Sequence, residues 1–347
     1  MTEAPRPESR RGRAGAGRAA GVLLVVFAWL CALGGAVLML LYALPQLQLT
    51  NDLTALAASF IPYGILSWSA ATLLFGWAAR RWMKSLAVLT LVCLIVQIVW
   101  ARPYWPGTPP PAGEGESLTV LTMNLRCDEP ALSGLVEVVE RERPDIVVLQ
   151  DLSQEGWDYL QGTSWWQTLP QHSMQPKDQP LAAAETDPCG SVVFAHATVT
   201  QASASDAAQP VVSVALPSGS LTVVPVSLPA LGTGLDPWLL GFETLDATLA
   251  SHTSVGTATA PMLVIGDFNA TREHLPMRQL IAEHDLVDAA EQARAGWQPT
   301  FPADRRYPPL VAIDHVLLSP SLTASEVSAF SVKYGAHRGL IARLGPA

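Results

Sequence analysis

Long apolar runs in the N-terminal part of the chain constrain its fold most strongly. Residues 20–44 contain no charged side chain, and a helix of about 25 residues is longer than the ~30 Å hydrocarbon core of a bilayer. Residues 53–79 and 85–100 form two further apolar runs, and Pro62, inside the second, is tolerable in a packed bundle. The succession predicts three transmembrane helices within residues 20–101. Buried helices of a soluble domain are the alternative.

The basic residues around these runs predict how the chain crosses the membrane. Five arginines precede the first run, and Arg80, Arg81 and Lys84 lie between the second and the third, whereas residues 45–52 contain no Lys or Arg. Lys and Arg are retained on the cytoplasmic side of a membrane. Residues 1–19 are therefore expected to form a basic cytoplasmic tail. Three spans place the C-terminal region outside the cytoplasm, in a multi-pass protein of the plasma membrane.

The rest of the sequence divides into a linker and one domain. Residues 102–117 are rich in Pro and Gly, which indicates an extended linker that holds the domain off the bilayer. Residues 118–347 are enough for one large core. Residues 117–347 hold 12 Lys plus Arg against 25 Asp plus Glu, a net charge of −13. Because enzymes of nucleic acids usually carry a basic stripe, this charge disfavours a nucleic-acid substrate.

Short runs rich in Val, Ile and Leu recur in this domain and are typical of buried strands. Amphipathic helical patterns separate several of them, at residues 132–143 and 238–251. The pattern predicts an α/β domain with mixed sheets. The predicted strands cover residues 118–123, 145–150, 191–195, 211–216, 221–227, 262–266 and 311–318.

One strand runs into a pair of polar residues that suit phosphoester chemistry. Residues 262–266 end in Gly266 and are followed by Asp267, Phe268 and Asn269. In an extended chain the side chains of Asp267 and Asn269 point the same way. A carboxylate that can take a proton, beside an amide that can hold a phosphate oxygen, fits hydrolysis at phosphorus. An ordinary turn at the end of a strand is the alternative.

The order of the strand-end motifs resembles the endonuclease/exonuclease/phosphatase superfamily, which has the metal-dependent fold of DNase I. Thr300-Phe301-Pro302 is similar to the Thr-Trp-Pro element of its membrane-anchored bacterial members. The resemblance covers about residues 117–345. It implies a DNase I-like β-sandwich of two sheets flanked by helices, with the active site where strand ends converge. The matching motifs are Asn124, Asp151, Gly266-Asp267-Phe268-Asn269, Ile313-Asp314-His315 and Gly335-Ala336-His337.

The resemblance implies a role for four of these residues. Asn124 and Asp151 match the positions that hold a divalent metal, so Mg²⁺ or Mn²⁺ is the expected cofactor. Asp267 matches the acid that orients or deprotonates the attacking water, and Asn269 matches the amide that contacts the phosphate.

The histidine of the expected site is present, but three family positions are altered. Asp314 matches the acid that supports the catalytic His337, and His337 would stabilise charge on phosphorus. Asp151 replaces a Glu, which withdraws the carboxylate by about 1.5 Å. Ser227 replaces a His that acts on the phosphate or the leaving group, and Ala336 replaces an acid that would orient His337.

Three functions are consistent with these features. The leading one is a membrane-anchored, extracytoplasmic, metal-dependent phosphoester hydrolase of reduced activity that acts on a small phosphoester or a phospholipid headgroup. The second is a catalytically degenerate pseudoenzyme that serves as a binding or scaffold module. The third is a nuclease, which would need a basic groove. The bilayer is the expected partner through the three transmembrane helices, and the sequence does not identify a protein partner.

Two cysteines of the predicted outer domain are candidates for a disulfide. Cys127 follows the first strand and Cys189 precedes the strand at residues 191–195. Thiols outside the cytoplasm can oxidise. If the two strands are antiparallel neighbours, the end of one lies beside the start of the other, and a bridge between Cys127 and Cys189 is expected. Two unpaired buried thiols are the alternative.

Overall fold

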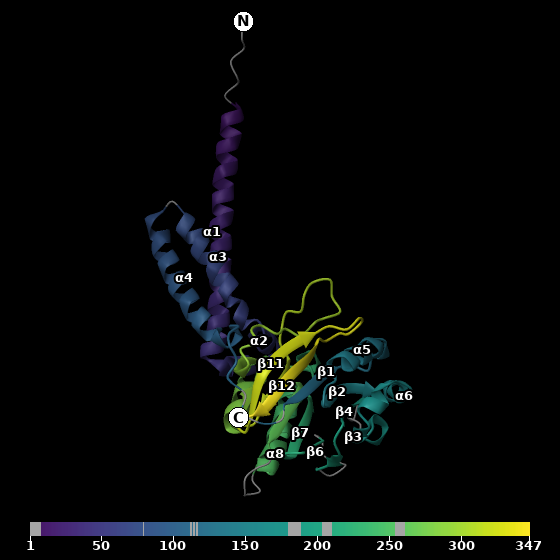
Figure 1. The fold of residues 1–347 in the computed structure, drawn as a ribbon. Coiled ribbons are helices and arrows are strands. Elements are labelled where there is room, and N and C mark those ends of the chain that lie inside the picture. The colour runs from purple at the N-terminus through teal and green to yellow at the C-terminus, as the bar shows by residue number, and fades with distance from the viewer. Residues whose placement is uncertain are drawn as a thin grey trace. The chain divides into compact units, whose positions relative to one another are not determined.

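The chain forms two compact units, one helical and one built mainly of strands. The computed structural model describes residues 8–78, 80–111, 113, 115, 117–179, 189–202, 210–253 and 261–347. One unit consists of Met1–Gln48 and Phe60–Arg102, and the other of Leu49–Ser59 and Pro103–Ala347. Figure 1 shows the helices of the first unit and the two sheets of the second.

The helical unit holds two helices that are long and apolar enough to cross a membrane, α1 (Glu8–Ala43) over its Gly21–Ala43 part and α4 (Arg81–Trp100). The predicted second span is not one helix. It is divided into α2 (Asp52–Ala58) and the stretch Ile61–Trp77, which contains α3 (Gly64–Trp77), and the two pieces are bent by 60°. The described residues therefore offer two spans, or three if the bent pair counts as one.

Local chemistry explains why the second apolar run breaks. The side chain of Asn51 accepts a hydrogen bond from the Thr54 N–H at 3.1 Å and so begins α2 at Asp52. Pro62 follows shortly after α2, where its missing N–H and fixed φ interrupt an α-helix and favour a new helical start. The span expected at residues 53–79 is therefore not one continuous helix, and Pro62 stands at the start of its second piece.

Small and polar residues hold the helices of this unit together. A Cβ at Gly35 of α1 would lie 2.7 Å from the Trp68 ring, so only glycine allows this approach. The buried Gln97 of α4 donates its Nε2–H to the Ile61 carbonyl at 2.9 Å. Close backbone contact and interhelical hydrogen bonds are the forces that associate helices in a bilayer, where apolar burial alone gives little.

The second unit is a sandwich of two mixed six-stranded sheets, as predicted. The first sheet has the order β11-β12-β1-β2-β4-β3 and the second β5-β6-β7-β8-β10-β9. The first consists of β1 (Leu118–Asn124), β2 (Ile146–Ser153), β3 (Gln171–His172), β4 (Cys189–Ala195), β11 (Leu322–Phe330) and β12 (Gly339–Pro346). The second consists of β5 (Val199–Gln201), β6 (Val212–Leu216), β7 (Gly219–Ser227), β8 (Met262–Asp267), β9 (Val287–Asp288) and β10 (Asp314–Leu318).

Apolar side chains fill three layers of this unit. Val148 and Ile265 belong to the core between the sheets. The alternate residues Val147 and Val264 point to the outer faces, where helices cover them. Strands buried on both faces read as continuous apolar runs. The helices are α5 (Leu132–Glu142), α6 (Gln154–Gln161) and α7 (Trp165–Thr168) on the first sheet, and α8 (Leu235–Thr253) and α9 (Leu275–Glu283) on the second. The short α10 (Ala289–Gln292) instead contributes Ala289 to the core between the sheets.

The predicted linker makes hydrogen bonds with the domain. The Tyr104 hydroxyl donates to Glu273 at 2.5 Å. The N–H groups of Gly107 and Gly113 donate to the carbonyls of Arg294 and Pro346, both at 3.0 Å. Through these hydrogen bonds the segment from Tyr104 to Gly113 lies along the surface of the second unit.

The segment Leu49–Ser59 also belongs to the second unit, although it lies within the predicted membrane region. Asp52 accepts a hydrogen bond from the Leu235 N–H at the start of α8, at 2.9 Å. The fully buried His274 ring contacts the Ala55 carbonyl through Nε2 at 3.0 Å and accepts from the Thr271 N–H through Nδ1 at 2.9 Å. The ring is therefore neutral and bridges α2 to the loop before α9.

We predict that His274 makes the second unit sensitive to acid. Burial lowers the pKa of His274 to about 4, whereas an unfolded histidine titrates near 6.5. Between these two values the unfolded chain binds a proton that the folded chain does not, so the free energy of unfolding falls as the pH falls, by on the order of 3 kcal/mol in total. His274→Gln cannot titrate and should flatten this slope in urea unfolding followed by tryptophan fluorescence. If the free energy of unfolding depended on pH equally in the wild type and in His274→Gln, His274 would not be the source of the acid sensitivity.

Candidate active site

Strand pairing brings the polar strand ends together at one edge of the sandwich. β1 and β2 run parallel and end side by side, with Asn124 opposite Gln150. β7 and β8 do the same, with Ser227 opposite Asp267. β10 runs antiparallel to β8 and begins where β8 ends, so Asp314 faces Asp267. Residues far apart in the sequence thus meet because their strands end at one edge.

Unusual backbone geometry at this edge orients the side chains. Gly266 has φ +142°, and a Cβ there would lie 2.1 Å from the Val226 carbonyl oxygen. Only glycine fits this approach, which explains the Gly that precedes Asp267. Asp151 and Asn269 have φ values of +50° and +47°. Asp and Asn tolerate this left-handed region better than most residues do.

The carboxylate of Asp267 is the hub of the site. It is 1% exposed. One oxygen, Oδ2, accepts from Asn124 Nδ2 at 2.9 Å and from Asn269 Nδ2 at 3.1 Å. The other oxygen, Oδ1, accepts from the Asn269 N–H at 2.8 Å. Asn269 is held in turn by a 2.7 Å bond from its Nδ2 to the Leu228 carbonyl. Since a carboxylate has about four acceptor positions, one remains on Oδ1.

His337 lies beside this hub and is held by Asp314. Nδ1 of His337 lies 3.0 Å from Asp314 Oδ2, and Nε2 lies 3.9 Å from Asp267 Oδ2. The ring packs against Phe301 with 4.8 Å between ring centroids. Asp314 thus fixes the orientation of the imidazole and leaves Nε2 facing Asp267.

Burial and neighbouring charges shift the pKa values of both groups. Burial, followed by repulsion from Asp314, raises the pKa of Asp267 to about 7, although His337 opposes this change. Burial disfavours a charge on His337, but attraction to Asp314 and Asp267 outweighs it and raises its pKa to about 9. Near neutral pH the site therefore contains an imidazolium beside a carboxylate that exchanges its proton easily. These are the properties of a charge stabiliser and a general base.

The donor set fits a hard divalent cation. Buried Asp314 Oδ1 has no hydrogen-bond partner among the described residues. Ligand atoms of Asp267 and Asp314 lie within 4.8 Å of each other, whereas the protonated His337 beside them donates hydrogen bonds and offers no lone pair to a metal. Asp151 lies near enough to raise the pKa of Asp267 through like-charge repulsion. A cation among these carboxylates would relieve the repulsion, and oxygen-rich sets are what Mg²⁺ and Mn²⁺ prefer. Asn124 and Asp151 as the principal ligands stay a prediction.

The altered positions have distinct surroundings. Ser227 is not isolated, because its hydroxyl donates to Asp151 Oδ1 at 3.0 Å. Sequence reasoning found no neighbour for this hydroxyl. Ala336 contributes its carbonyl, which accepts from the Ala303 N–H at 2.7 Å. The Ser227 hydroxyl and the Ala336 carbonyl are thus both hydrogen-bonded, although neither residue supplies the imidazole or the acid of the family pattern.

Two further residues near the site have clear surroundings. His315 contacts Asp288 through Nδ1 at 2.8 Å and the Ala270 carbonyl through Nε2 at 2.9 Å, so it is a structural residue. Burial opposes its charge, but the bond to Asp288 outweighs this and raises its pKa. Arg126 is exposed, and its charge lowers the pKa of His337. Sequence reasoning missed Arg126, because nothing in its sequence context distinguishes it from other basic loop residues.

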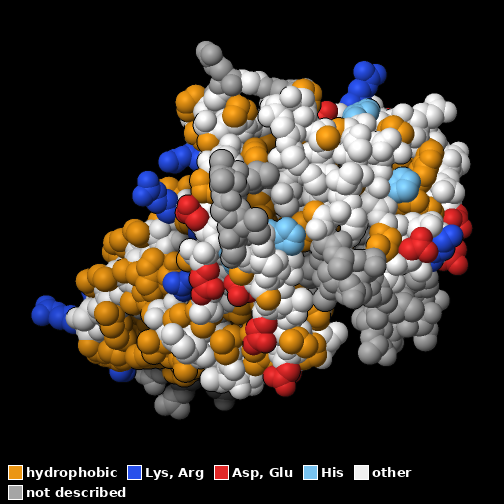
Figure 2. Space-filling model, turned by 90° about the horizontal axis from the view of Figure 1, so that it is seen from below, with side chains coloured by type: hydrophobic (Ala, Val, Ile, Leu, Met, Phe, Trp, Pro, Cys, Tyr) orange, Lys and Arg blue, Asp and Glu red, His pale blue; other side chains and the backbone are white. Residues whose placement is uncertain are grey.

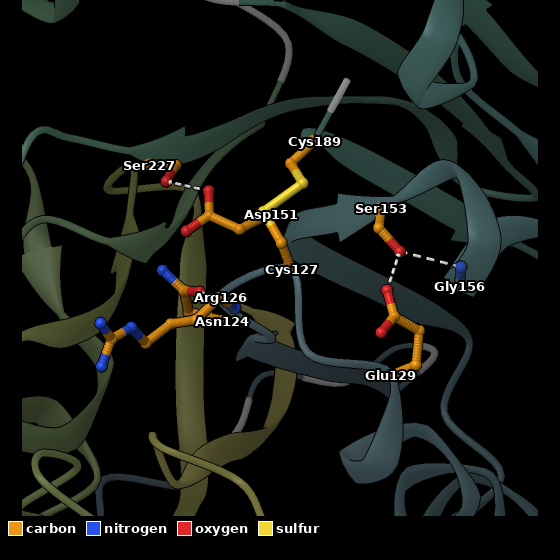
Figure 3. Close-up of a disulfide and its surroundings, with 9 residues drawn as sticks. All are labelled: Asn124, Arg126, Cys127, Glu129, Asp151, Ser153, Gly156, Cys189 and Ser227. Atoms are coloured by element: carbon orange, nitrogen blue, oxygen red, sulfur yellow. Dashed lines mark hydrogen bonds between the residues drawn. A yellow bond between two sulfur atoms is a disulfide. The ribbon is translucent and has the colours of Figure 1, made fainter. Parts of the chain in front are cut away.

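Cys127 and Cys189 form the predicted disulfide, with their Cα atoms 6.0 Å apart (Figure 3). The reason for the pairing differs from the expected one. β1 and β4 are not neighbours, because both pair with β2, on opposite sides of it. The bridge spans 62 residues of sequence, and on chain-entropy grounds it adds about 4 kcal/mol to stability.

Comparisons with known proteins agree with this architecture. The sequence model of the Endonuclease/Exonuclease/phosphatase family matches residues 121–333. A structure from that family in Bacteroides vulgatus has 14% identity and a TM-score of 0.52, and covers 67% of this chain and 100% of that one. One from Beutenbergia cavernae DSM 12333 has 18% identity and a TM-score of 0.49, over 67% and 72% of the two chains.

A functionally unknown conserved protein from Enterococcus faecalis V583 has 12% identity and a TM-score of 0.50, and covers 66% of this chain and 100% of that one. At these identities the likeness concerns the fold alone. A search of curated proteins gives no significant match.

We predict that Asp314→Asn lowers the pKa of His337 in the metal-free protein, because it removes the main attraction that raises this pKa. Histidine ring signals in an NMR pH titration measure the change. The matched control is Asp288→Asn, which should lower the pKa of His315 instead and leave that of His337 almost unchanged. A pKa of His337 that does not respond to Asp314→Asn would show that Asp314 does not support its charge.

Proposed function

Since this chain belongs to the endonuclease/exonuclease/phosphatase family, we propose that it hydrolyses a phosphoester with a divalent cation. One observation carries the proposal: Asp267, buried and bonded to Asn124 and Asn269, faces a His337 that Asp314 holds. A base, an amide and a cationic imidazole at one point form the minimal set for attack of water on phosphorus.

Each residue of this set has a role that follows from its contacts. The remaining acceptor position of Asp267 takes the proton of the attacking water or orients it. His337, kept protonated by Asp314, stabilises negative charge that develops on the phosphoryl oxygens. Asn269, which matches the amide that contacts the phosphate in the family pattern, here holds the Asp267 carboxylate through its N–H and Nδ2 groups. When bound, the cation polarises a phosphoryl oxygen as a Lewis acid, and Asn124 and Asp151 would hold it.

The charge of the domain favours a small phosphoester or a lipid headgroup. Lys and Arg side chains of the described residues are scattered on the face shown in Figure 2 and form no stripe there. The net charge of −13 for residues 117–347 also repels a long polyanion. A nuclease is therefore the less favoured reading.

The structure of the second unit supports an extracytoplasmic position. Leu49–Ser59 and Pro103–Ala347 form one unit, so they lie on the same side of the membrane. The chain between them must then cross the bilayer twice or not at all. α4 is long and apolar enough to cross, which favours two crossings. Ile61–Trp77, which passes as a candidate span only together with α2, would be the other crossing. With α1 this gives three spans, and the N-terminal arginines favour a cytoplasmic N-terminus.

We expect alkaline phosphatase fused after Ala347 to be active in a bacterial host, because that enzyme works only outside the cytoplasm. The matched control is the same reporter fused after Ala78, next to the basic Arg80-Arg81 loop, which should be inactive there. A green fluorescent protein fused at the two positions should give the reverse pattern. An inactive fusion after Ala347 together with an active one after Ala78 would invert the topology.

A binding module is the second candidate, favoured by Ser227 and Ala336, which replace two groups that the family pattern uses. Loss of one catalytic group commonly lowers a rate by 10² to 10⁴ fold. Activity that survives should therefore be weak. An assay of metal-dependent phosphoester cleavage separates the hydrolase from the binding module.

We predict weak Mn²⁺- or Mg²⁺-dependent cleavage of bis(p-nitrophenyl) phosphate or of a short-chain phospholipid by the full chain in detergent. Asp267→Ala should lower the rate at least about 100-fold, because it removes the base. Asp246→Ala, which removes a carboxylate on α8 paired with His284, is the control and should leave the rate unchanged. Absence of metal-dependent cleavage would favour the binding module. Cleavage that Asp267→Ala does not change would place the chemistry elsewhere.

A further inference from the structure

Asp151 stands on an irregular stretch of backbone. The pairing of β2 with β4 shifts register between Leu149 and Leu152, so Gln150 and Asp151 lie in a bulge. Asp151 itself has φ +50°. A bulged residue lacks part of the regular ladder, so its direction depends on contacts other than strand pairing. Those contacts decide where the carboxylate points.

The backbone of the bulge is held by the loop after β1. The N–H of Leu125 donates to the Gln150 carbonyl at 3.0 Å, and the N–H of Cys127 donates to the Asp151 carbonyl at 2.8 Å. The loop thus continues along β2 past the last paired residue of β1. Cys127 has φ +56°, and its backbone contact reaches Asp151 directly.

The disulfide joins this loop to the opposite side of β2. Cys189 pairs with Ser153, two residues beyond Asp151, and is bonded to Cys127. The bridge therefore spans the bulge, and Figure 3 shows it next to Asp151. Ser153 is fixed as well, because its hydroxyl donates to Glu129 at 2.6 Å and accepts from the Gly156 N–H at 2.9 Å.

The side chain of Asp151 is held from the other sheet. Ser227, at the end of β7, donates its hydroxyl to Asp151 Oδ1 at 3.0 Å (Figure 3). Ser227 is also the register partner of Asp267 on β8. The hydroxyl thus ties the carboxylate of Asp151 to the strand pair that carries Asp267. A carboxylate one methylene shorter than the family's Glu reaches less far, so its direction matters more.

We propose that the Ser227 hydroxyl and the Cys127–Cys189 disulfide are positioning groups that aim the Asp151 carboxylate at the cation site. This inference rests on the proposed function, because it assumes that a divalent cation binds among these carboxylates. The two groups act on different parts of Asp151, the hydroxyl on its side chain and the disulfide on its backbone. Neither needs to touch the cation or the substrate.

The affinity for Mn²⁺ tests this inference directly. Binding of Mn²⁺ to the full chain in detergent, followed by electron paramagnetic resonance, gives a dissociation constant without any assay of activity. Removal of a group that orients a metal ligand commonly weakens binding 10- to 100-fold. We expect about a 10-fold weaker affinity for Ser227→Ala and for the double variant Cys127→Ser/Cys189→Ser.

Two matched controls accompany these variants. Ser227→Thr keeps the hydroxyl and should retain nearly the affinity of the wild type. Cys31→Ser/Cys93→Ser removes the two free cysteines of the helical unit and should leave the affinity unchanged. If the disulfide variant does not fold, the comparison of Ser227→Ala with Ser227→Thr is the test, because these two substitutions leave the disulfide intact.

A second comparison separates positioning from general damage to the fold. In an Asp151→Ala background the carboxylate is absent, so Ser227→Ala should have no further effect on Mn²⁺ binding. A Ser227→Ala protein that binds Mn²⁺ as tightly as the wild type would overturn this inference but not the proposed function. The same would follow if Ser227→Ala weakened Mn²⁺ binding equally with and without the Asp151 carboxylate. A wild type that binds no Mn²⁺ would overturn the proposed metal dependence, and this inference with it.

Discussion

The buried carboxylate of Asp267 is the constraint on which the rest of the site depends. An ionised carboxylate in the interior is costly unless hydrogen bonds and an opposite charge compensate it. Asn124 and Asn269 supply the hydrogen bonds, and His337 supplies the charge. The compensation is incomplete, and the pKa of Asp267 therefore stays near 7. A fully compensated carboxylate would be a poor base at neutral pH.

This arrangement requires the two sheets to be packed correctly. Asn124 and His337 come from the first sheet and its loops, whereas Asp267 and Asp314 come from the second. The apolar core between the sheets, with residues such as Val148 and Ile265, therefore sets the distances in the site. The docking of Leu49–Ser59 against His274 and the start of α8 adds a segment from between α1 and α3 to the same unit.

The sequence revealed those parts of the fold that are buried on both faces. β2 and β8 read as unbroken apolar runs, and the structure brings Asp151 of β2 near Asp267 of β8. β11 and β12 were missed, because polar residues such as Ser325, Glu326 and Arg343 interrupt the apolar pattern of these two strands. The contact between Ser227 and Asp151 could not be foreseen, since it depends on the bulge in β2 and on the approach of two sheets. The break before Pro62 was underestimated because apolar content alone does not show where a helix ends.

The central claim is that the carboxylates at this edge hold a divalent cation beside Asp267. Anomalous X-ray scattering from crystals soaked in Mn²⁺ tests it most directly, because the signal locates the metal without reference to activity. The account predicts one strong peak in contact with Asn124 and Asp151, which is weaker at the same Mn²⁺ concentration in Asp151→Ala crystals. A peak elsewhere would contradict the account. So would the absence of a peak at Mn²⁺ concentrations that saturate protein sites built from carboxylate and amide oxygens.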